Sequence, residues 1–109
     1  FTFNEFYNLF SNYGLRSNVI FPVYGLAEAS LAVTFSRPIE NVKSIEIDRK
    51  YLGMGDRVHV INKDKSLSLV NVGKPIKGCR VRIVDSNKVP VEEGIIGEIQ
   101  IEGNNVTAE

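Results

Sequence analysis

The sequence predicts an α+β fold, because it divides into a front part with helical patterns and a β-rich remainder. Residues 1 to about 35 contain aromatic residues at helical spacing, then a short apolar stretch and a run rich in alanine. Residues 36–109 contain several stretches in which polar and apolar residues alternate, separated by turn-forming residues. We therefore expect an amphipathic helix and a short strand–helix unit, followed by a β-rich unit with an inserted hairpin.

The first expected element is an amphipathic helix over residues 2–13. Its aromatic side chains recur at intervals of three and four residues: Phe3, Phe6, Tyr7, Phe10 and Tyr13. Thr2 and Glu5 form a capping-box pattern, in which each side chain accepts a hydrogen bond from a free backbone N–H. Gly14 can adopt the left-handed conformation that ends such a helix.

A short strand and a second helix are expected next. Residues 19–21 are apolar and predict a buried strand, which Pro22 ends because proline has no N–H to donate. Residues 28–33 are rich in alanine and leucine, which favours a helix. Residues 34–41 predict a loop, since a proline interrupts them.

Strands are expected in the rest of the chain, where polar and apolar residues alternate: residues 44–48, 57–61, 66–70, 79–84 and 97–103. The polar residues 62–65 are expected to form a turn that joins the second and third of these strands in a hairpin. Residues 85–88 predict another turn, after the fourth strand.

The composition limits the partners and the compartment that we expect. The chain has 109 residues, of which 13 are basic and 13 are acidic, so its charge gives no reason to expect binding to nucleic acid or to an anionic membrane. No apolar run is long enough for a membrane span. Cys79 is the only cysteine, so no internal disulfide can form, and a reducing, cytoplasmic location is expected. Because the sequence begins with Phe1 rather than methionine, we expect it to be an excised part of a longer protein.

The most informative segment is Tyr24-Gly25-Leu26-Ala27-Glu28, at the junction of the apolar stretch and the helix-like run. An aromatic ring can pack against a nucleotide base, and a carboxylate suits Mg²⁺ that is also held by phosphates. Glycine lets the backbone approach a ligand closely, or simply forms the turn. From the residues alone, Glu28 is explained better as an acid that stabilises the first turn of a helix, and Tyr24 can be explained by packing in the core.

Three blocks occur in the same order as in the acyl-adenylate-forming enzymes, and their order and spacing are more specific than any block alone. The blocks are residues 24–28, the turn Gly73-Lys-Pro-Ile-Lys-Gly78 with the strand 81–85, and Gly-Glu-Ile-Gln-Ile-Glu-Gly at 97–103. The chain resembles the fatty-acyl-AMP ligase branch of this superfamily, because alanine precedes the glutamate of the first block and a long segment separates the first two blocks. The resemblance implies that residues of about 44–72 are the insertion that this branch carries.

The resemblance also implies a reaction and its cofactors. Such an enzyme uses ATP and Mg²⁺ to convert a fatty acid to acyl-AMP and pyrophosphate, and then passes the acyl group to an acyl carrier protein. The nucleotide-binding residues would be Tyr24, Gly25, Leu26 and Ala27, and Glu28 would bind Mg²⁺. A part of an acyl-CoA synthetase is the alternative interpretation, and a non-enzymatic β-rich interaction module is a second alternative.

The resemblance further implies that the chain is part of a larger N-terminal adenylate-forming domain. Residues 1–35 would come from its αβ layer, and residues 36–109 would be its β-rich subdomain. The family's phosphate-binding loop, ribose-binding aspartate and mobile lysine are not found in the sequence, so we expect the 109 residues alone to be inactive. Separation from the larger sheet is expected to expose an edge at residues 19–21 and the apolar face of the first helix, which favours a dimer.

Four other residues are not expected to be functional. Asp56 lies in a Gly-Asp-Arg sequence similar to the family's ribose-binding motif, but it precedes the third block, whereas that motif follows it. His59 has no second histidine and no cysteine close to it in the sequence, which argues against a metal site. Cys79, at the start of a strand, is expected to be packed. Asn105 begins an Asn-Val-Thr glycosylation sequence, a triplet that often arises by chance.

Overall fold

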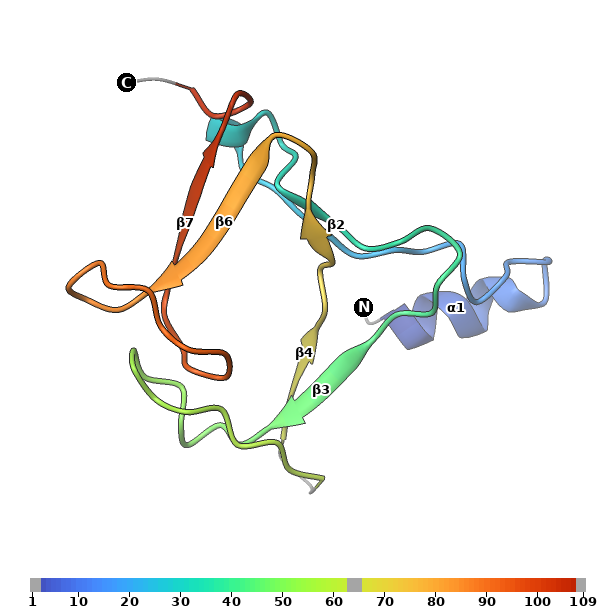
Figure 1. The fold of residues 1–109 in the computed structure, drawn as a ribbon. Coiled ribbons are helices and arrows are strands. Elements are labelled where there is room, and N and C mark those ends of the chain that lie inside the picture. Colours follow the sequence, from blue (N-terminus) through green and yellow to red (C-terminus); the bar gives the residue numbers. More distant parts are fainter. Residues whose placement is uncertain (1–2, 63–65, 108–109) are drawn as a thin grey trace.

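The computed structural model describes residues 3–62 and 66–107, which form a mixed helix and strand fold (Figure 1). The strands build one three-stranded sheet and two two-stranded sheets, and every pairing is antiparallel. The expected α+β class is therefore confirmed. In chain order the elements are α1 (Phe3–Ser11), β1 (Val23–Tyr24), η1 (Ala27–Ala29), β2 (Thr34–Phe35), β3 (Ser44–Ile47), β4 (Leu67–Val70), β5 (Lys74–Pro75), β6 (Cys79–Val84) and β7 (Glu98–Gly103).

The helix α1 forms where the aromatic spacing predicted it, and it stands to one side of the strands (Figure 1). The ring centroids of Phe6 and Phe10, one helical turn apart, are separated by 4.7 Å. The helix ends at a left-handed glycine: Gly14 has a φ of 88°, and the N–H of Leu15 donates to the Phe10 carbonyl at 3.3 Å. Thr2 of the predicted capping box lies outside the described residues.

In the three-stranded sheet, β2 lies between β1 and β5, with Thr34 paired to Tyr24 on one side and to Pro75 on the other. The strand predicted at residues 19–21 is wrong, because pairing begins only after Pro22. The carbonyl of this proline accepts two hydrogen bonds from the residue that follows β2. Proline lacks a donor but keeps its acceptor, so it leads into this edge strand rather than ending one.

The helix predicted over residues 28–33 is also wrong. Only Ala27–Ala29 is helical, as one 3₁₀ turn, and Ser30 and Leu31 then adopt left-handed φ angles of 52° and 61°. These two residues reverse the chain, which returns as β2. The helix preference of alanine and leucine is weak, and the tertiary contacts described below override it.

The strands β3 and β4 pair with each other over their whole length, which corrects the predicted hairpin between residues 57–61 and 66–70. Residues 57–61 form only isolated bridges, because their backbone bonds to β3 on one side and to residues 94–96 on the other. The alternating pattern therefore predicted an extended chain correctly but not its partner. Of the turn expected at residues 62–65, residues 63–65 lie outside the described residues.

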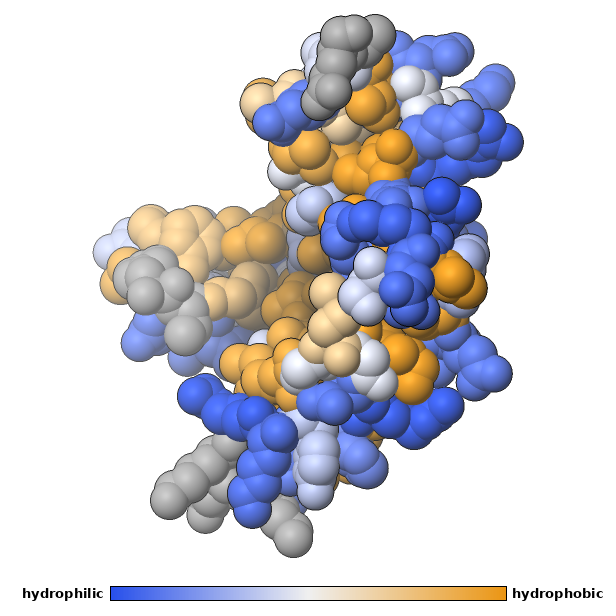
Figure 2. Space-filling model, turned by 90° about the vertical axis from the view of Figure 1, so that its left-hand side faces the viewer, coloured by the Kyte–Doolittle hydropathy of each residue, from blue (hydrophilic) through white to orange (hydrophobic). Residues whose placement is uncertain are grey.

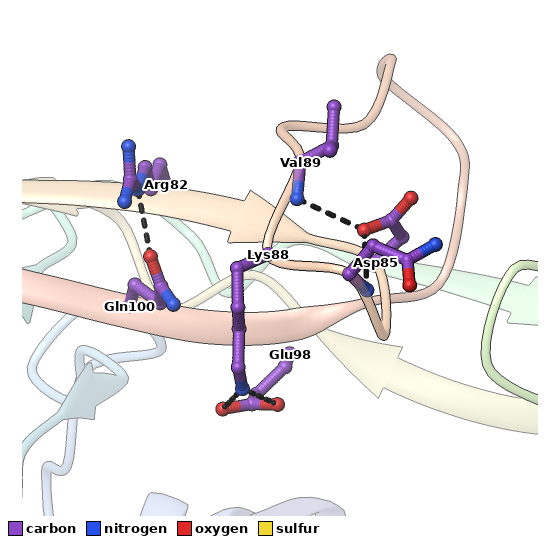
Figure 3. A network of polar contacts seen from close by, with 7 residues as sticks. Arg82, Asp85, Lys88, Val89, Glu98 and Gln100 are labelled. Carbon is purple, nitrogen blue, oxygen red and sulfur yellow. Dashed lines mark hydrogen bonds and ion pairs between the residues drawn. The ribbon is translucent and has the colours of Figure 1, made fainter.

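The ribbon of β6 and β7 follows the alternation predicted for residues 79–84 and 97–103, and its pairs run from Cys79–Gly103 to Val84–Glu98. Figure 3 shows polar pairs that join the strands and the turn beyond them: the Arg82 side chain donates to Gln100 at 2.8 Å, and Lys88 Nζ lies 2.7 Å from a carboxylate oxygen of Glu98. In the turn after β6, an Asp85 carboxylate oxygen accepts from the backbone N–H groups of Asn87 and Val89. The predicted turn at residues 85–88 is thus confirmed.

The buried core is small and joins the turn after β1 to the β6–β7 ribbon. Ala29, Val33 and Cys79 form its buried cluster. Partly buried apolar side chains pack against this cluster: Tyr24, Leu26, Ile76, Val81, Ile101 and Val106. Residues more than 70 positions apart in the sequence therefore share one core.

Much apolar surface stays exposed outside this core. No residue of α1 is buried, and the exposed fractions of Leu9 and Tyr13 are 55% and 85%. Figure 2 shows apolar surface in the middle of one face and on the projection that carries α1. The apolar surface expected on the first helix is confirmed, whereas the expected dimer stays a prediction. Among the described residues, no helix is both long and apolar enough to cross a membrane.

Candidate functional site

The five predicted site residues lie together in a tight turn between β1 and β2. The backbone N–H of Val33 donates to the carbonyl of Tyr24 at 3.0 Å and closes the base of this turn. We call residues 24–33 the motif turn. Their positions depend on contacts inside the motif turn and on contacts with the chain after β7.

Gly25 is required by a close approach of two backbone segments. A Cβ atom at this position would lie 2.0 Å from the carbonyl oxygen of Leu31, far inside van der Waals contact. The φ angle of Gly25 is not in the left-handed region. The glycine therefore lets the two sides of the motif turn pack closely, in line with the turn-forming role considered from the sequence.

Leu26 and Ala27 supply the carbonyl groups that organise the 3₁₀ turn. The Leu26 backbone is extended, and its carbonyl accepts from the N–H groups of Ala29 at 3.1 Å and Leu31 at 2.9 Å. The Ala27 carbonyl accepts from Ser30 at 3.1 Å. The Leu26 side chain packs against the core, whereas Ala27 is exposed. The carbonyls of these two residues are thus used within the motif turn.

Tyr24 and Glu28 differ in their surroundings. Tyr24 is half-buried and packs against the Ala29–Val33–Cys79 cluster, so part of its ring belongs to the core. Glu28 is exposed, and within residues 3–62 and 66–107 its carboxylate has no hydrogen bond or ion pair. An aromatic ring and a free carboxylate are therefore held four residues apart on one constrained turn.

The surroundings of Glu28 bear on the expected magnesium contact. Within the part of the chain that the structure describes, no group of three or more His, Cys, Asp or Glu side chains could enclose a metal ion. Mg²⁺ commonly binds proteins through one or two carboxylates and takes its other ligands from phosphates and water. A single unpaired carboxylate such as Glu28 fits this second type of site and does not fit an all-protein site.

Asn105 and Thr107, which follow β7, were not recognised as part of this site from the sequence. The Asn105 side-chain amide donates to the carbonyls of Ala29 at 3.0 Å and Ala32 at 2.7 Å. The backbone N–H of Thr107 donates to the Glu28 carbonyl at 2.8 Å. The only local signal was the glycosylation triplet that contains both residues, and it gave no indication of a contact with the motif.

These contacts offset the strain of the motif turn. A left-handed conformation costs a non-glycine residue about 1–2 kcal/mol, and Ser30 and Leu31 both adopt it. Each hydrogen bond to the chain after β7 contributes about 0.5–1.5 kcal/mol. The conformation of the motif turn therefore depends on a segment far away in the sequence.

The other residues weighed from the sequence have structural surroundings. The Asp56 carboxylate accepts from the backbone N–H of Gly53 at 2.8 Å, as expected for a loop acid. The rings of His59 and Tyr51 lie 4.6 Å apart. Cys79 is buried in the core cluster.

A hollow of about 500 Å³ lies beside β2, away from the motif turn. Arg37 and Lys43 line it, and they lie 3.8 Å and 3.1 Å from carboxylate oxygens of Glu40. The hydrogen bond from Lys43, together with its charge, lowers the pKa of Glu40. Because none of the five motif residues lines the hollow, we do not assign it to the nucleotide.

Several relatives align with nearly the whole chain. A medium-chain-fatty-acid–[acyl-carrier-protein] ligase of Teredinibacter turnerae is 33% identical over 106 residues, which cover 96% of this chain and 16% of the relative. A long-chain-fatty-acid–AMP ligase of Mycobacterium tuberculosis is also 33% identical over 106 residues, with 96% of this chain and 18% of the relative covered. The chain thus spans less than a fifth of the length of these relatives.

The fold agrees with these alignments. The crystal structure of a fatty acid AMP ligase from Legionella pneumophila matches 94% of this chain and 18% of that chain, with a TM-score of 0.83 and 33% identity. The AMP-binding enzyme family matches residues 3–109, which includes all three sequence blocks and every described element. The chain therefore belongs to the AMP-binding enzyme family.

Proposed function

We propose that this chain forms part of the nucleotide-binding wall of a fatty-acyl-AMP ligase, which converts a fatty acid and ATP to acyl-AMP and pyrophosphate. The observation that carries the proposal is the exposed, unpaired carboxylate of Glu28 on a turn that also holds Tyr24. If Tyr24 and Glu28 had both been buried in a closed core, a non-enzymatic interaction module would have been favoured instead. The names of two relatives, a medium-chain-fatty-acid ligase and a long-chain-fatty-acid–AMP ligase, support the substrate class.

Each residue of the motif has a proposed role that follows from its surroundings. The accessible part of the Tyr24 ring packs against adenine, while its other part stays anchored in the core. The backbone of Gly25, Leu26 and Ala27 lies beside the nucleotide, and Ala27 brings no hydroxyl group to the phosphate. Glu28 holds Mg²⁺, which neutralises phosphate charge when ATP is bound.

The acceptor of the acyl group is proposed to be an acyl carrier protein. One relative carries this acceptor in its name, and the others include fatty acid AMP ligases. We assign residues 44–72 to the insertion typical of this branch; they contain β3, a long connection and β4. We also keep the cytoplasmic location expected from the composition as part of the proposal.

The proposed function is tested in the complete protein that contains these 109 residues. We expect ATP–pyrophosphate exchange that depends on a fatty acid and on Mg²⁺. Glu28→Gln, which keeps the size but removes the charge, is expected to lower the exchange rate roughly 100-fold. Glu93→Gln, at another exposed acid, is the matched control and is expected to retain full activity. Exchange unaffected by Glu28→Gln would contradict the role of this carboxylate.

Two further experiments test the acyl acceptor and the need for other parts of the enzyme. Transfer of the acyl group to a carrier protein but not to CoA is expected, and efficient formation of acyl-CoA would instead favour the acyl-CoA synthetase alternative. The 109-residue chain alone is expected to show no ATP–pyrophosphate exchange. Turnover by this chain alone would contradict the expectation that other parts of the enzyme are required.

A further inference from the structure

Asn105 connects the chain after β7 to both sides of the left-handed reversal in the motif turn. Its side-chain amide donates to Ala29, which precedes the reversal, at 3.0 Å and to Ala32, which follows it, at 2.7 Å. The sequence separations of these contacts are 76 and 73 residues. The backbone carbonyl of Asn105 in turn accepts from the Ser30 hydroxyl at 3.2 Å.

The chemistry of these contacts requires an amide at this position. Both partners of the side chain are carbonyl oxygens, which only accept hydrogen bonds, so only the amide nitrogen with its two N–H groups can face them. An aspartate has nearly the same shape but would bring carboxylate oxygens against two carbonyls. Asn105 is partly buried, which reduces the access of water that could replace the lost donors.

These contacts fix the backbone on which Glu28, the residue proposed to hold Mg²⁺, is carried. Glu28 lies one residue before Ala29, and its own carbonyl accepts from the backbone N–H of Thr107 at 2.8 Å. The Glu28 side chain has no partner of its own among the described residues, so its position follows from that of the backbone. The backbone on each side of the reversal is therefore attached to the segment after β7.

We propose that Asn105 is a positioning residue for nucleotide use: it holds the motif turn so that Tyr24 and Glu28 keep their places relative to the β6–β7 ribbon. This inference rests on the proposed function. A glycan on Asn105 would abolish this positioning role, since a sugar on the amide nitrogen would take the place of one of the two N–H groups.

The test compares Asn105→Asp with Asn104→Asp in the complete protein that contains these residues. Asn104 is the exposed neighbour in the same loop, so the control makes the same chemical change beside the proposed contact. Hydrogen exchange is measured on peptides that cover residues 26–34 and 79–84, and the KM for ATP is measured by pyrophosphate exchange. Asn105→Ala is the second variant, because it removes the donors without adding a charge.

We expect Asn105→Asp and Asn105→Ala to speed exchange of residues 26–34 roughly tenfold or more, with residues 79–84 unchanged. We expect the KM for ATP to rise roughly tenfold with a smaller change in kcat, and Asn104→Asp to change neither. An unchanged KM, or faster exchange that is equal in both peptides, would overturn the positioning role while the proposed function stands. Wild-type protein without pyrophosphate exchange would overturn the proposed function, and this inference with it.

Discussion

The β6–β7 ribbon and the motif turn differ in where their stabilising contacts come from. The ribbon pairs residues 79–84 with residues 98–103, and its polar pairs join neighbouring strands. The motif turn contains residues in left-handed conformations, and it is held by Asn105 and Thr107. The ribbon is therefore stabilised by regular pairing between two strands, and the motif turn by contacts from a distant segment.

This difference bears on the proposed function, because the motif turn carries Glu28, a proposed site residue whose carboxylate has no partner among the described residues. In the ribbon, Arg80 pairs with Glu102, and Glu98 pairs with Lys88 of the turn after β6. In the motif turn, backbone groups carry the contacts and the Glu28 carboxylate stays free. A strained turn held from outside can thus present a charged group that a regular strand pair would neutralise.

The largest expected effect comes from adding a methyl group at the close contact inside the motif turn. Gly25→Ala would place a Cβ atom 2.0 Å from the Leu31 carbonyl oxygen, so we expect the free energy of unfolding to fall by about 3 kcal/mol. Denaturant unfolding measures this loss. Gly78→Ala, before the ribbon, is the control: its φ is 85°, but nothing lies within 4 Å of the added atom. We expect that control to lose about 1–2 kcal/mol. Equal losses would show that the motif turn relaxes around the new methyl group.

A smaller effect of opposite sign, an increase in the free energy of unfolding, is expected when the backbone strain at Leu31 is relieved. Leu31 has a left-handed φ of 61° and a side chain that is 72% exposed, so it gains little from burial. Asparagine tolerates this conformation better, and Leu31→Asn is expected to raise the free energy of unfolding by about 0.5–1 kcal/mol. The control Leu9→Asn, at an exposed position of α1, is expected to lower it by about 0.5 kcal/mol. A loss in both variants would mean that Leu31 is not strained.

In the ribbon, removal of an exposed ion pair is expected to have little effect. Arg80 and Glu102 lie 2.7 Å apart, but their side chains are 80% and 73% exposed. A double-mutant cycle with Arg80→Ala and Glu102→Ala should give a coupling energy of about 0.2–1 kcal/mol, which falls further at about 1 M salt. A coupling that is larger and insensitive to salt would mean that side-chain pairs, rather than backbone pairing, stabilise the ribbon.

The smallest expected effect is a change in protonation on β3, which pairs with β4. Hydrogen bonds from Ser66 and Ser68 lower the pKa of the Glu46 carboxyl. A lowered pKa in the folded state adds stability at pH values above the pKa of the unfolded chain, and this contribution is lost as the pH falls through the folded value. Ser66→Ala should therefore raise the pKa of Glu46 in an NMR titration and weaken this acid dependence. Ser68→Ala is the comparison and should shift the pKa less; the reverse order would mean that Ser68 is the stronger partner.

Local sequence patterns predicted the regular elements well. The aromatic spacing and Gly14 gave α1 and its end, and alternation gave β3, β6 and β7 near their observed limits. The order of three glycine-containing blocks led to the AMP-binding family, which residues 3–109 match. These features could be read from the sequence because each depends on neighbours within a few residues, where helix and strand periodicity are visible.

The pairing partners and the motif turn could not be predicted in this way. Residues 57–61 alternate as a strand should, yet they lie between β3 and residues 94–96 instead of forming the expected hairpin. Residues 28–33 have a composition typical of a helix, yet only one 3₁₀ turn forms. Periodicity shows that a segment is extended or helical, but it carries no information about which distant backbone will supply its hydrogen bonds.

The sequence by itself determined the family, the α+β class and the identity of the candidate site residues. Only the tertiary structure decided where Tyr24 and Glu28 lie, and which distant residues, Asn105 and Thr107, bond to the motif turn. The physical reason is that a short turn with left-handed residues is unstable alone and takes the conformation that its partners stabilise. Those partners lie more than 70 residues away, and the chain must fold before they meet.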